Sequence, residues 1–167
     1  MRVFFGIRLS SKVKEIAATT QSNLSTKGNF TSYDNLHITL RFIGSVTMSE
    51  LEDLKDCLYN ISFNSFDILI NDIGYFNSRG KYTLFLKVES DELHDFYSKL
   101  EAELVKFGFD KENRNYKPHI TLVREAQNIN SGSIIPTNMH VNEIALIESK
   151  RVNGQLIYED IYKVILR

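Results

Sequence analysis

Hydrophobic and polar residues alternate along this chain in segments whose period switches between two residues and about 3.6 residues. Segments of period two that are rich in β-branched and aromatic residues predict strands. Segments with apolar residues every three or four positions predict amphipathic helices. The predicted strands are 2–8, 36–44, 66–76, 82–88, 118–124, 140–149 and 155–166, and the predicted helices are 11–24, 47–61 and 91–107.

Local signals place several of these boundaries. Ser10 is a candidate N-cap for the first helix, and Thr47 with Glu50 fits the capping-box pattern at the start of the second. A loop is expected over 128–132, and the pair Asn153-Gly154 favours a tight hairpin turn between the last two strands. The predicted order is therefore β-α-β-α-β-β-α-β-β-β.

A four-residue segment occurs twice. His37-Ile38-Thr39-Leu40 recurs 82 positions later as His119-Ile120-Thr121-Leu122. With the same offset, the predicted elements 2–8, 11–24 and 36–42 fall on 84–90, 93–106 and 118–124, which are also predicted as strand, helix and strand. The repetition of a whole β-α-β unit predicts two related lobes in a single domain over residues 1–167, with an internal pseudo-twofold axis.

Strand alternation assigns faces to the two copies, since successive side chains point to opposite sides of a sheet. The core face of the first copy takes Ile38, Leu40 and Phe42, and that of the second takes Ile120 and Leu122. The open face takes His37, Thr39, Arg41, His119 and Thr121. Arg124 has the wrong parity for the open face in a regular strand, so it must lie at a strand end or at a bulge to join the others. We expect two His/Thr pairs to face each other across a groove.

Length and charge narrow the class of protein. The chain has 167 residues, with 20 Lys and Arg against 21 Asp and Glu, for a formal net charge of −1. Such a balance excludes a general nucleic-acid coat protein, which needs a cationic excess to displace counterions from the phosphates. It is compatible with an enzyme that holds one phosphate with one or two local cations.

Further sequence features suit a soluble protein of the cytoplasm. The single cysteine, Cys57, excludes an internal disulfide and is expected to be a buried structural thiol. No signal peptide or membrane-spanning run is visible, so we expect a cytoplasmic protein without membrane contact. Nothing in the sequence implies a protein partner, and a monomer is expected.

The paired histidines suggest acid–base chemistry at phosphorus. An imidazole titrates near pH 6.5, so one member of a pair can be neutral while the other is protonated. In-line displacement at phosphorus needs a base on the attacking side and an acid on the leaving side. Two threonine hydroxyls and one arginine could hold the non-bridging oxygens. A catalytic zinc site would need a third protein ligand, and none lies at matching positions, so we expect neither a metal nor another cofactor.

The two motifs resemble those of the two-histidine (2H) phosphoesterase superfamily, and within it the RNA 2′,3′-cyclic phosphodiesterases once called 2′-5′ RNA ligases. The similar segments are 1–7, 35–44, 117–124 and 147–149, together with Gly154 and Tyr158. Asn77 stands where the family often has proline, and Tyr33 is the nearest counterpart of an aromatic residue common before the first motif. The resemblance covers nearly the whole chain.

The resemblance implies an α+β fold of two lobes, in which two antiparallel sheets form a V-shaped groove with the helices outside. It implies metal-independent hydrolysis of a terminal 2′,3′-cyclic phosphate to a 2′-phosphate, with RNA 3′ ends or nucleotides as substrates. It also gives Arg124 the role of a phosphate ligand. Arg41 is a further candidate, with Thr39 and Thr121, for binding the substrate.

Several alternatives stay open. We expect protonated His37 to donate to the departing O3′ and neutral His119 to activate water, but the near-symmetric repeat also allows the reverse. The same groove could cleave or join 2′-5′ linkages, open an ADP-ribose cyclic phosphate, or bind RNA ends without turnover. Weaker candidates for the groove are His94 and His140, and for base stacking Tyr75, Tyr82 and Tyr116.

Overall fold

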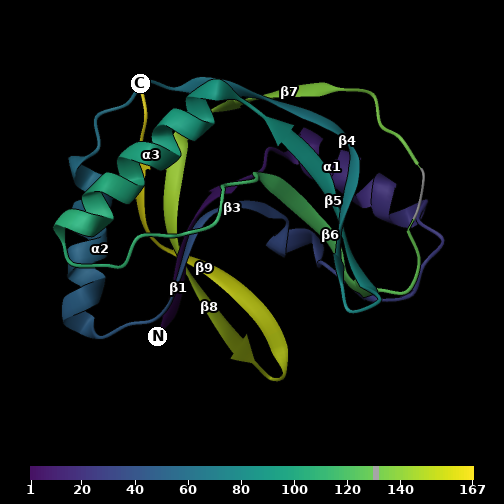
Figure 1. The fold of residues 1–167 in the computed structure, drawn as a ribbon, viewed down its shortest axis with the longest axis horizontal. Helices are drawn as coiled ribbons and strands as arrows, with labels where there is room; N and C mark the ends of the chain where they lie inside the picture. Colours follow the sequence, from purple (N-terminus) through teal and green to yellow (C-terminus); the bar gives the residue numbers. More distant parts are fainter. Residues whose placement is uncertain (130–131) are drawn as a thin grey trace.

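The computed structural model describes residues 1–129 and 132–167 and is an α+β fold (Figure 1). Its elements in chain order are β1 (Arg2–Arg8), α1 (Ser11–Ser22), β2 (Asn29–Phe30), the 3₁₀ turn η1 (Tyr33–Asn35), β3 (His37–Ser45), α2 (Met48–Asn60), β4 (Phe66–Ser78), β5 (Lys81–Glu89), α3 (Asp91–Lys106), β6 (His119–Ala126), β7 (Thr137–Val141), β8 (Glu143–Val152) and β9 (Gln155–Ile165).

Local sequence signals account for most of these boundaries. The Ser10 hydroxyl accepts a hydrogen bond from the backbone N–H of Val13, and Thr47 with Glu50 forms the complete capping box. Asn153 and Gly154 both have positive φ, 52° and 79°, which is the geometry that a type I′ turn requires. Gly108 follows α3 with φ of 90° and ends it as expected.

The sequence pattern missed three short elements. The predicted strand 140–149 is two strands, β7 and β8, and neither β2 nor η1 was predicted. These elements are only two to five residues long, apart from β8, so they carry too few alternations for a periodic signal. The predicted loop over 128–132 lies partly outside the described residues.

The strands form one mixed-length antiparallel sheet in the order β7-β4-β5-β6-β3-β1-β8-β9, with β2 added beside β6. The two sheets expected from the sequence are the two halves of this sheet, β7-β4-β5-β6 and β3-β1-β8-β9. They meet where β3 pairs with β6 through one residue pair only, Ile38 and Ile120. Because so little pairing holds the halves in one plane, they diverge on either side of this junction, and the β8–β9 and β4–β5 hairpins point away from it (Figure 1).

The pseudo-twofold repeat is visible in the strand pairing. β1 pairs with β3 as β5 pairs with β6: His37 lies opposite Arg8, and His119 lies opposite Lys87. Equivalent residues of the motif strands β3 and β6 are 82 positions apart, whereas equivalent residues of the neighbouring strands β1 and β5 are 79 positions apart. A single offset of 82 for the whole β-α-β unit is therefore wrong for its first strand, because the second copy has three more residues between its strands' paired positions.

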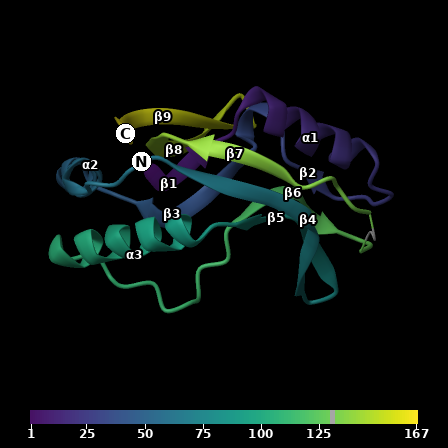
Figure 2. The same cartoon turned by 90° about the horizontal axis from the view of Figure 1, so that it is seen from above.

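Helices cover the outer faces and tie the two halves together. α1 and α3 lie on opposite sides of the strands (Figure 2). The Gln21 side chain of α1 donates to the Leu122 carbonyl in β6, and Glu101 of α3 binds Arg41 of β3. One buried apolar cluster runs through both halves and includes the Cys57 side chain, which is fully buried. Within the described residues, no helix is long and apolar enough to span a membrane.

Candidate active site

Both motif strands carry a bulge directly after the His-x-Thr segment. In β3, Thr39 pairs with Gly6 and Arg41 pairs with Phe5, so Leu40 is an extra residue without a partner of its own. The same happens in β6, where Thr121 and Val123 pair with Phe85 and Leu84 and Leu122 is extra. Each bulge shifts the side-chain alternation by one position, because the extra residue breaks the two-residue period.

The bulge in β6 explains how Arg124 comes to the exposed face of the strand. Leu122 and Val123 are both fully buried, and the next residue, Arg124, is exposed on the side of His119 and Thr121. Glu125, which follows it, has a positive φ of 55°. The condition set by the sequence, that Arg124 must lie at a bulge or a strand end, is met.

The bulge in β3 changes the expected environment of Phe42, and Arg41 beside it is engaged in an ion pair. The side chain of Phe42 is 49% exposed and borders the groove, so its prediction as a core residue is wrong. Arg41 also lines the groove, as strand alternation predicts, but its guanidinium is 2.6 Å from the Glu101 carboxylate and donates to the Asp110 carbonyl at 2.7 Å. Its donors are therefore engaged within the protein.

His37 is held in a fixed orientation. Its Nδ1 lies 2.6 Å from the Asn35 carbonyl oxygen, which can only accept, so Nδ1 carries the proton of the neutral ring. Nε2 is then the acceptor, and the Thr39 hydroxyl donates to it at 2.8 Å. The rings of Phe4 and Tyr158 flank the imidazole, with centroids 5.0 and 5.1 Å away.

His119 repeats this arrangement with one difference. Its Nδ1 donates to the Lys117 carbonyl at 2.7 Å, again two residues before the histidine, and the rings of Phe76 and Phe85 flank it. Its Nε2 has no hydrogen-bond partner among the described residues. Thr121 is 8% exposed, and no printed contact joins its hydroxyl to the ring. In both rings Nδ1 is bonded to a backbone carbonyl, and Nε2 is bonded to Thr39 in His37 but has no partner among the described residues in His119.

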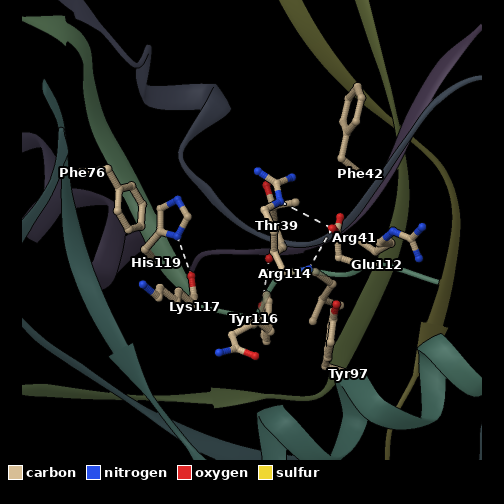
Figure 3. A pocket seen from close by; sticks show the side chains of 12 residues that line it. Thr39, Arg41, Phe42, Phe76, Tyr97, Glu112, Arg114, Tyr116, Lys117 and His119 are labelled. Carbon is tan, nitrogen blue, oxygen red and sulfur yellow. Dashed lines mark hydrogen bonds and ion pairs between the residues drawn. The ribbon is translucent and has the colours of Figure 1, made fainter. Parts of the chain in front are cut away.

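A cavity of about 650 Å³ opens between the two halves beside His119 and Thr39 (Figure 3). His37, Thr121 and Arg124 are not among the residues that line it. His119 and Phe76 form one side of it in this view, and Phe42 and Tyr97 lie on the other. Tyr116, at its base, stacks on Tyr97 with centroids 4.3 Å apart and donates from its hydroxyl to the Thr39 carbonyl. A volume of this size, with aromatic walls and a few polar groups, suits a nucleotide-sized ligand.

The two histidines differ in acidity. Burial lowers the pKa of His37 to about 4, with smaller lowering effects from the nearby charges of Arg8, Arg124 and His119, against a raising effect of the Asn35 carbonyl. Burial also lowers the pKa of His119, and Arg124 again contributes. The charge of Arg124 thus disfavours protonation of both rings. In the free protein at neutral pH, both rings are neutral, and His119 is the more easily protonated.

We expect the stability of the protein to fall as the pH drops from about 6.5 towards 4. The folded pKa of His37 is about 4, below the ordinary 6.5, so the unfolded chain binds more protons in this window and is favoured by acid. The difference corresponds to at most about 3 kcal/mol of unfolding free energy. Urea unfolding at pH 7 and at about pH 5 should show a smaller pH dependence for His37→Gln than for the unmodified protein. A His140→Gln variant is the control, and equal pH dependence in all three proteins would contradict the expectation.

The other sequence candidates lie elsewhere. His140 pairs with Asp67 at an exposed site on β7, and His94 packs against Tyr116 outside the cavity. Tyr75 and Tyr82 contact each other and do not border the cavity. The aromatic side chains that border the cavity in their stead are Phe42 and Phe76. The sequence offered no signal for Phe42, since the bulge that exposes it leaves the alternation of apolar and polar residues unchanged. Among the described residues, no three His, Cys, Asp or Glu side chains are grouped so that they could hold a metal ion.

A family model, curated proteins and solved structures that are similar to this chain all point to one family. The family model of the 2′-5′ RNA ligase superfamily matches residues 13–153. A Thermotoga maritima protein named RNA 2′,3′-cyclic phosphodiesterase is 32% identical over 131 residues, which is 74% of this chain and 70% of that protein. One of the same name from Methanothermobacter thermautotrophicus is 29% identical over 96% of both chains. The crystal structure of Escherichia coli LigT complexed with 3′-AMP has a TM-score of 0.84 and 25% identity, and the match covers 99% of this chain and 97% of that one.

Proposed function

Because this chain belongs to the 2′-5′ RNA ligase superfamily, we propose that it hydrolyses the 2′,3′-cyclic phosphate at RNA 3′ ends or on nucleotides, leaving a 2′-phosphate. The observation that carries the proposal is the pair of His-x-Thr segments, at equivalent places in the two halves, with one arginine acting on both rings. Relatives that bear the name RNA 2′,3′-cyclic phosphodiesterase support it.

In this reaction, water attacks phosphorus, a base takes a proton from the water, and the bond from phosphorus to O3′ breaks. O3′ leaves as a hydroxyl once an acid has donated a proton to it. Histidines on opposite sides of the phosphate suit the in-line geometry of such a displacement. Thr121 and Arg124 would bind the non-bridging oxygens, whose charge persists through the reaction. Thr39 would join them by turning its hydroxyl away from Nε2 of His37, which frees that nitrogen for water. Arg41 would contribute by fixing the wall behind Thr39, since its guanidinium is occupied by Glu101.

The environments of the two rings favour one assignment of roles. His37 resists protonation, and the Thr39 hydroxyl already hydrogen-bonds to its basic Nε2. His119 is protonated more readily, and its Nε2 is open to the groove. We therefore assign His37 as the base for water and His119 as the acid for O3′. This is the reverse of the first expectation from the sequence, which had no means of comparing how deeply the two rings are buried.

Arg124 should matter for both substrate binding and turnover. A charge-assisted hydrogen bond to phosphate contributes about 1.5–3 kcal/mol, so Arg124→Met should lower kcat/KM by roughly 10- to 100-fold. Arg124→Lys should retain part of the activity, because it keeps the charge and loses the planar pair of donors. Arg151→Met, at the exposed end of the β8–β9 hairpin, is the control. Unchanged kcat/KM in Arg124→Met would exclude this arginine as a phosphate ligand.

The proposed function is tested by product analysis. The protein is incubated with a 2′,3′-cyclic mononucleotide and with a cyclic-ended oligonucleotide, with and without EDTA, and the phosphate position in the product is resolved by NMR or chromatography. We expect a 2′-phosphate in both the presence and absence of EDTA. A 3′-phosphate would contradict the assigned leaving group, inactivity in EDTA would require a metal, and no product at all would leave a binding protein as the better interpretation.

The setting of the reaction follows from the same proposal. We propose that the chain works as a monomeric single domain in the cytoplasm. In support, its one cysteine is free and buried, and burial raises the pKa of the Cys57 thiol to about 12, so it is kept from thiolate chemistry.

A further inference from the structure

Arg8, in the strand beside the first motif, lies next to His37. The two residues are direct partners across β1 and β3, so their side chains leave the sheet on the same face. The guanidinium makes three bonds: Nε donates to the Asp160 carboxylate at 2.9 Å, and the two terminal nitrogens donate to the carbonyls of Tyr158 and Asp34. Because its donors are engaged in three directions, Arg8 is held in one place.

These bonds join the last strand to the segment that precedes His37. Tyr158 and Asp160 belong to β9, and Asp34 belongs to η1. Asn35, the last residue of η1, adds a fourth bond from its side-chain nitrogen to the Leu156 carbonyl of β9 at 2.8 Å. The backbone carbonyl of the same Asn35 accepts from Nδ1 of His37. The position of that carbonyl, and with it the direction of the imidazole, therefore depends on the contact between η1 and β9.

The second half of the molecule has no such arrangement. Lys87 occupies the position beside His119 that Arg8 occupies beside His37, but it is exposed and its side chain makes no hydrogen bond or ion pair among the described residues. Among the described residues, the ring of His119 has one hydrogen bond, to the Lys117 carbonyl in a loop. The extra bonds at His37 are thus a property of one histidine and not of the repeat.

We propose that Arg8, together with Asn35, is a positioning residue for His37: it ties β9 to η1 and so fixes the direction in which the imidazole presents Nε2 to the groove. This inference rests on the proposed function for its effect on turnover. Arg8 differs from Arg124, whose guanidinium has no partner among the described residues and is available to a substrate. A residue whose donors are already bonded within the protein orients other groups and is not itself a phosphate ligand.

The charges around His37 give the proposal a specific signature. Arg8 acts on the ring from β1, and Arg124 and His119 act on it from β6. Tyr158 of β9 packs on the ring, while the Asp160 carboxylate of β9 and the Asp34 carbonyl of η1 bind Arg8. Removing the Arg8 cation should raise the pKa of His37, since a neighbouring positive charge disfavours the protonated ring. Replacing Asp160 with asparagine removes its charge but keeps a side chain of the same shape. This should lower the pKa of His37, because the Arg8 charge is then uncompensated.

The experiment is a titration of the His37 ring by NMR in the unmodified protein and in Arg8→Met and Asp160→Asn. We expect the pKa of His37 to rise by roughly 0.5 in Arg8→Met and to fall in Asp160→Asn, as for a partly exposed neighbouring charge. Lys163→Met removes a similar ion pair between β8 and β9, with Glu143, and should leave the titration unchanged. Changes in the same direction in both variants, or none, would overturn the electrostatic part of the proposal.

Orientation is tested through Asn35. The ¹⁵N shifts of the imidazole show which nitrogen carries the proton, and Asn35→Ala should move the His37 ring away from its single Nδ1–H form. In a kinetic assay, Arg8→Met and Asn35→Ala should lower kcat roughly tenfold and leave inhibition by inorganic phosphate unchanged. Weakened phosphate inhibition in Arg8→Met would instead make Arg8 a phosphate ligand. The NMR readouts need no turnover, so they test the role of Arg8 even if the proposed reaction fails.

Discussion

Replacing either His37 or His119 with glutamine is expected to lower kcat for a 2′,3′-cyclic nucleotide by about 10²–10⁴-fold, the usual contribution of a positioned general acid or base. Glutamine keeps a polar side chain of similar reach but cannot take up or release a proton. His37→Gln also loses the ring contacts with Phe4 and Tyr158, so its fold is checked by circular dichroism and urea unfolding before rates are compared.

The two single variants should differ in their pH dependence. If His37 is the base, His37→Gln should lose the acid limb of the kcat/KM profile, and His119→Gln should lose the alkaline limb. For the unmodified protein, burial lowers the pKa of both rings, so the maximum of kcat/KM is expected on the acid side of pH 6.5. The double variant should be little slower than the slower single one, because both groups serve one step.

His140→Gln is the matched control, since His140 is an exposed histidine that pairs with Asp67 away from the cavity. Full activity in either motif variant would refute the paired-histidine mechanism. Exchange of the two limbs between the variants would leave the mechanism intact and restore the roles first expected from the sequence.

The repeat was the most informative feature of the sequence because it depends on residue identity as well as on period. His37 and His119, 82 residues apart, could be placed opposite each other before any coordinates, and strand alternation put Thr39 and Thr121 on the same faces. The family assignment follows from the same residues and is confirmed by the family comparison. Whether these residues carry out the reaction stays a prediction until the variants are measured.

The features that could not be predicted arise from bulges, very short elements and long-range packing, none of which changes the hydrophobic period or the composition. An extra residue at Leu40 brings Phe42 to the groove, and a leucine in a bulge cannot be distinguished by sequence from a leucine in a regular strand. η1 has three residues and β2 has two, too short for a pattern, yet η1 carries the carbonyl that orients His37. The difference in burial between the two histidines arises from packing between distant segments, such as Tyr158 on His37, and has no local signal.

The ion pair between Arg41 and Glu101 shows what this arginine does for the fold. The two side chains are 11% and 9% exposed, and the Nε of Arg41 is buried without a partner among the described residues. The second Glu101 oxygen accepts from the backbone N–H of Glu112, and Arg41 also donates to the Asp110 carbonyl. Through these bonds, the pair fastens the loop that leads from α3 to His119.

Glu101→Ala is therefore expected to lower the free energy of unfolding by about 3–5 kcal/mol, since it leaves the Arg41 charge buried and uncompensated. The double variant Arg41→Met with Glu101→Leu should recover most of this loss, because neither buried side chain is then charged. Lys106→Ala, which breaks the exposed pair with Glu103 in the same helix, is the control and should change stability by less than about 1 kcal/mol. Urea unfolding of the four proteins measures these values. If Glu101→Ala lowered the free energy of unfolding no more than Lys106→Ala does, the pair would be dispensable to the fold. A double variant that is stable but has a reduced kcat would show that the pair is needed to hold the loop before His119 in place.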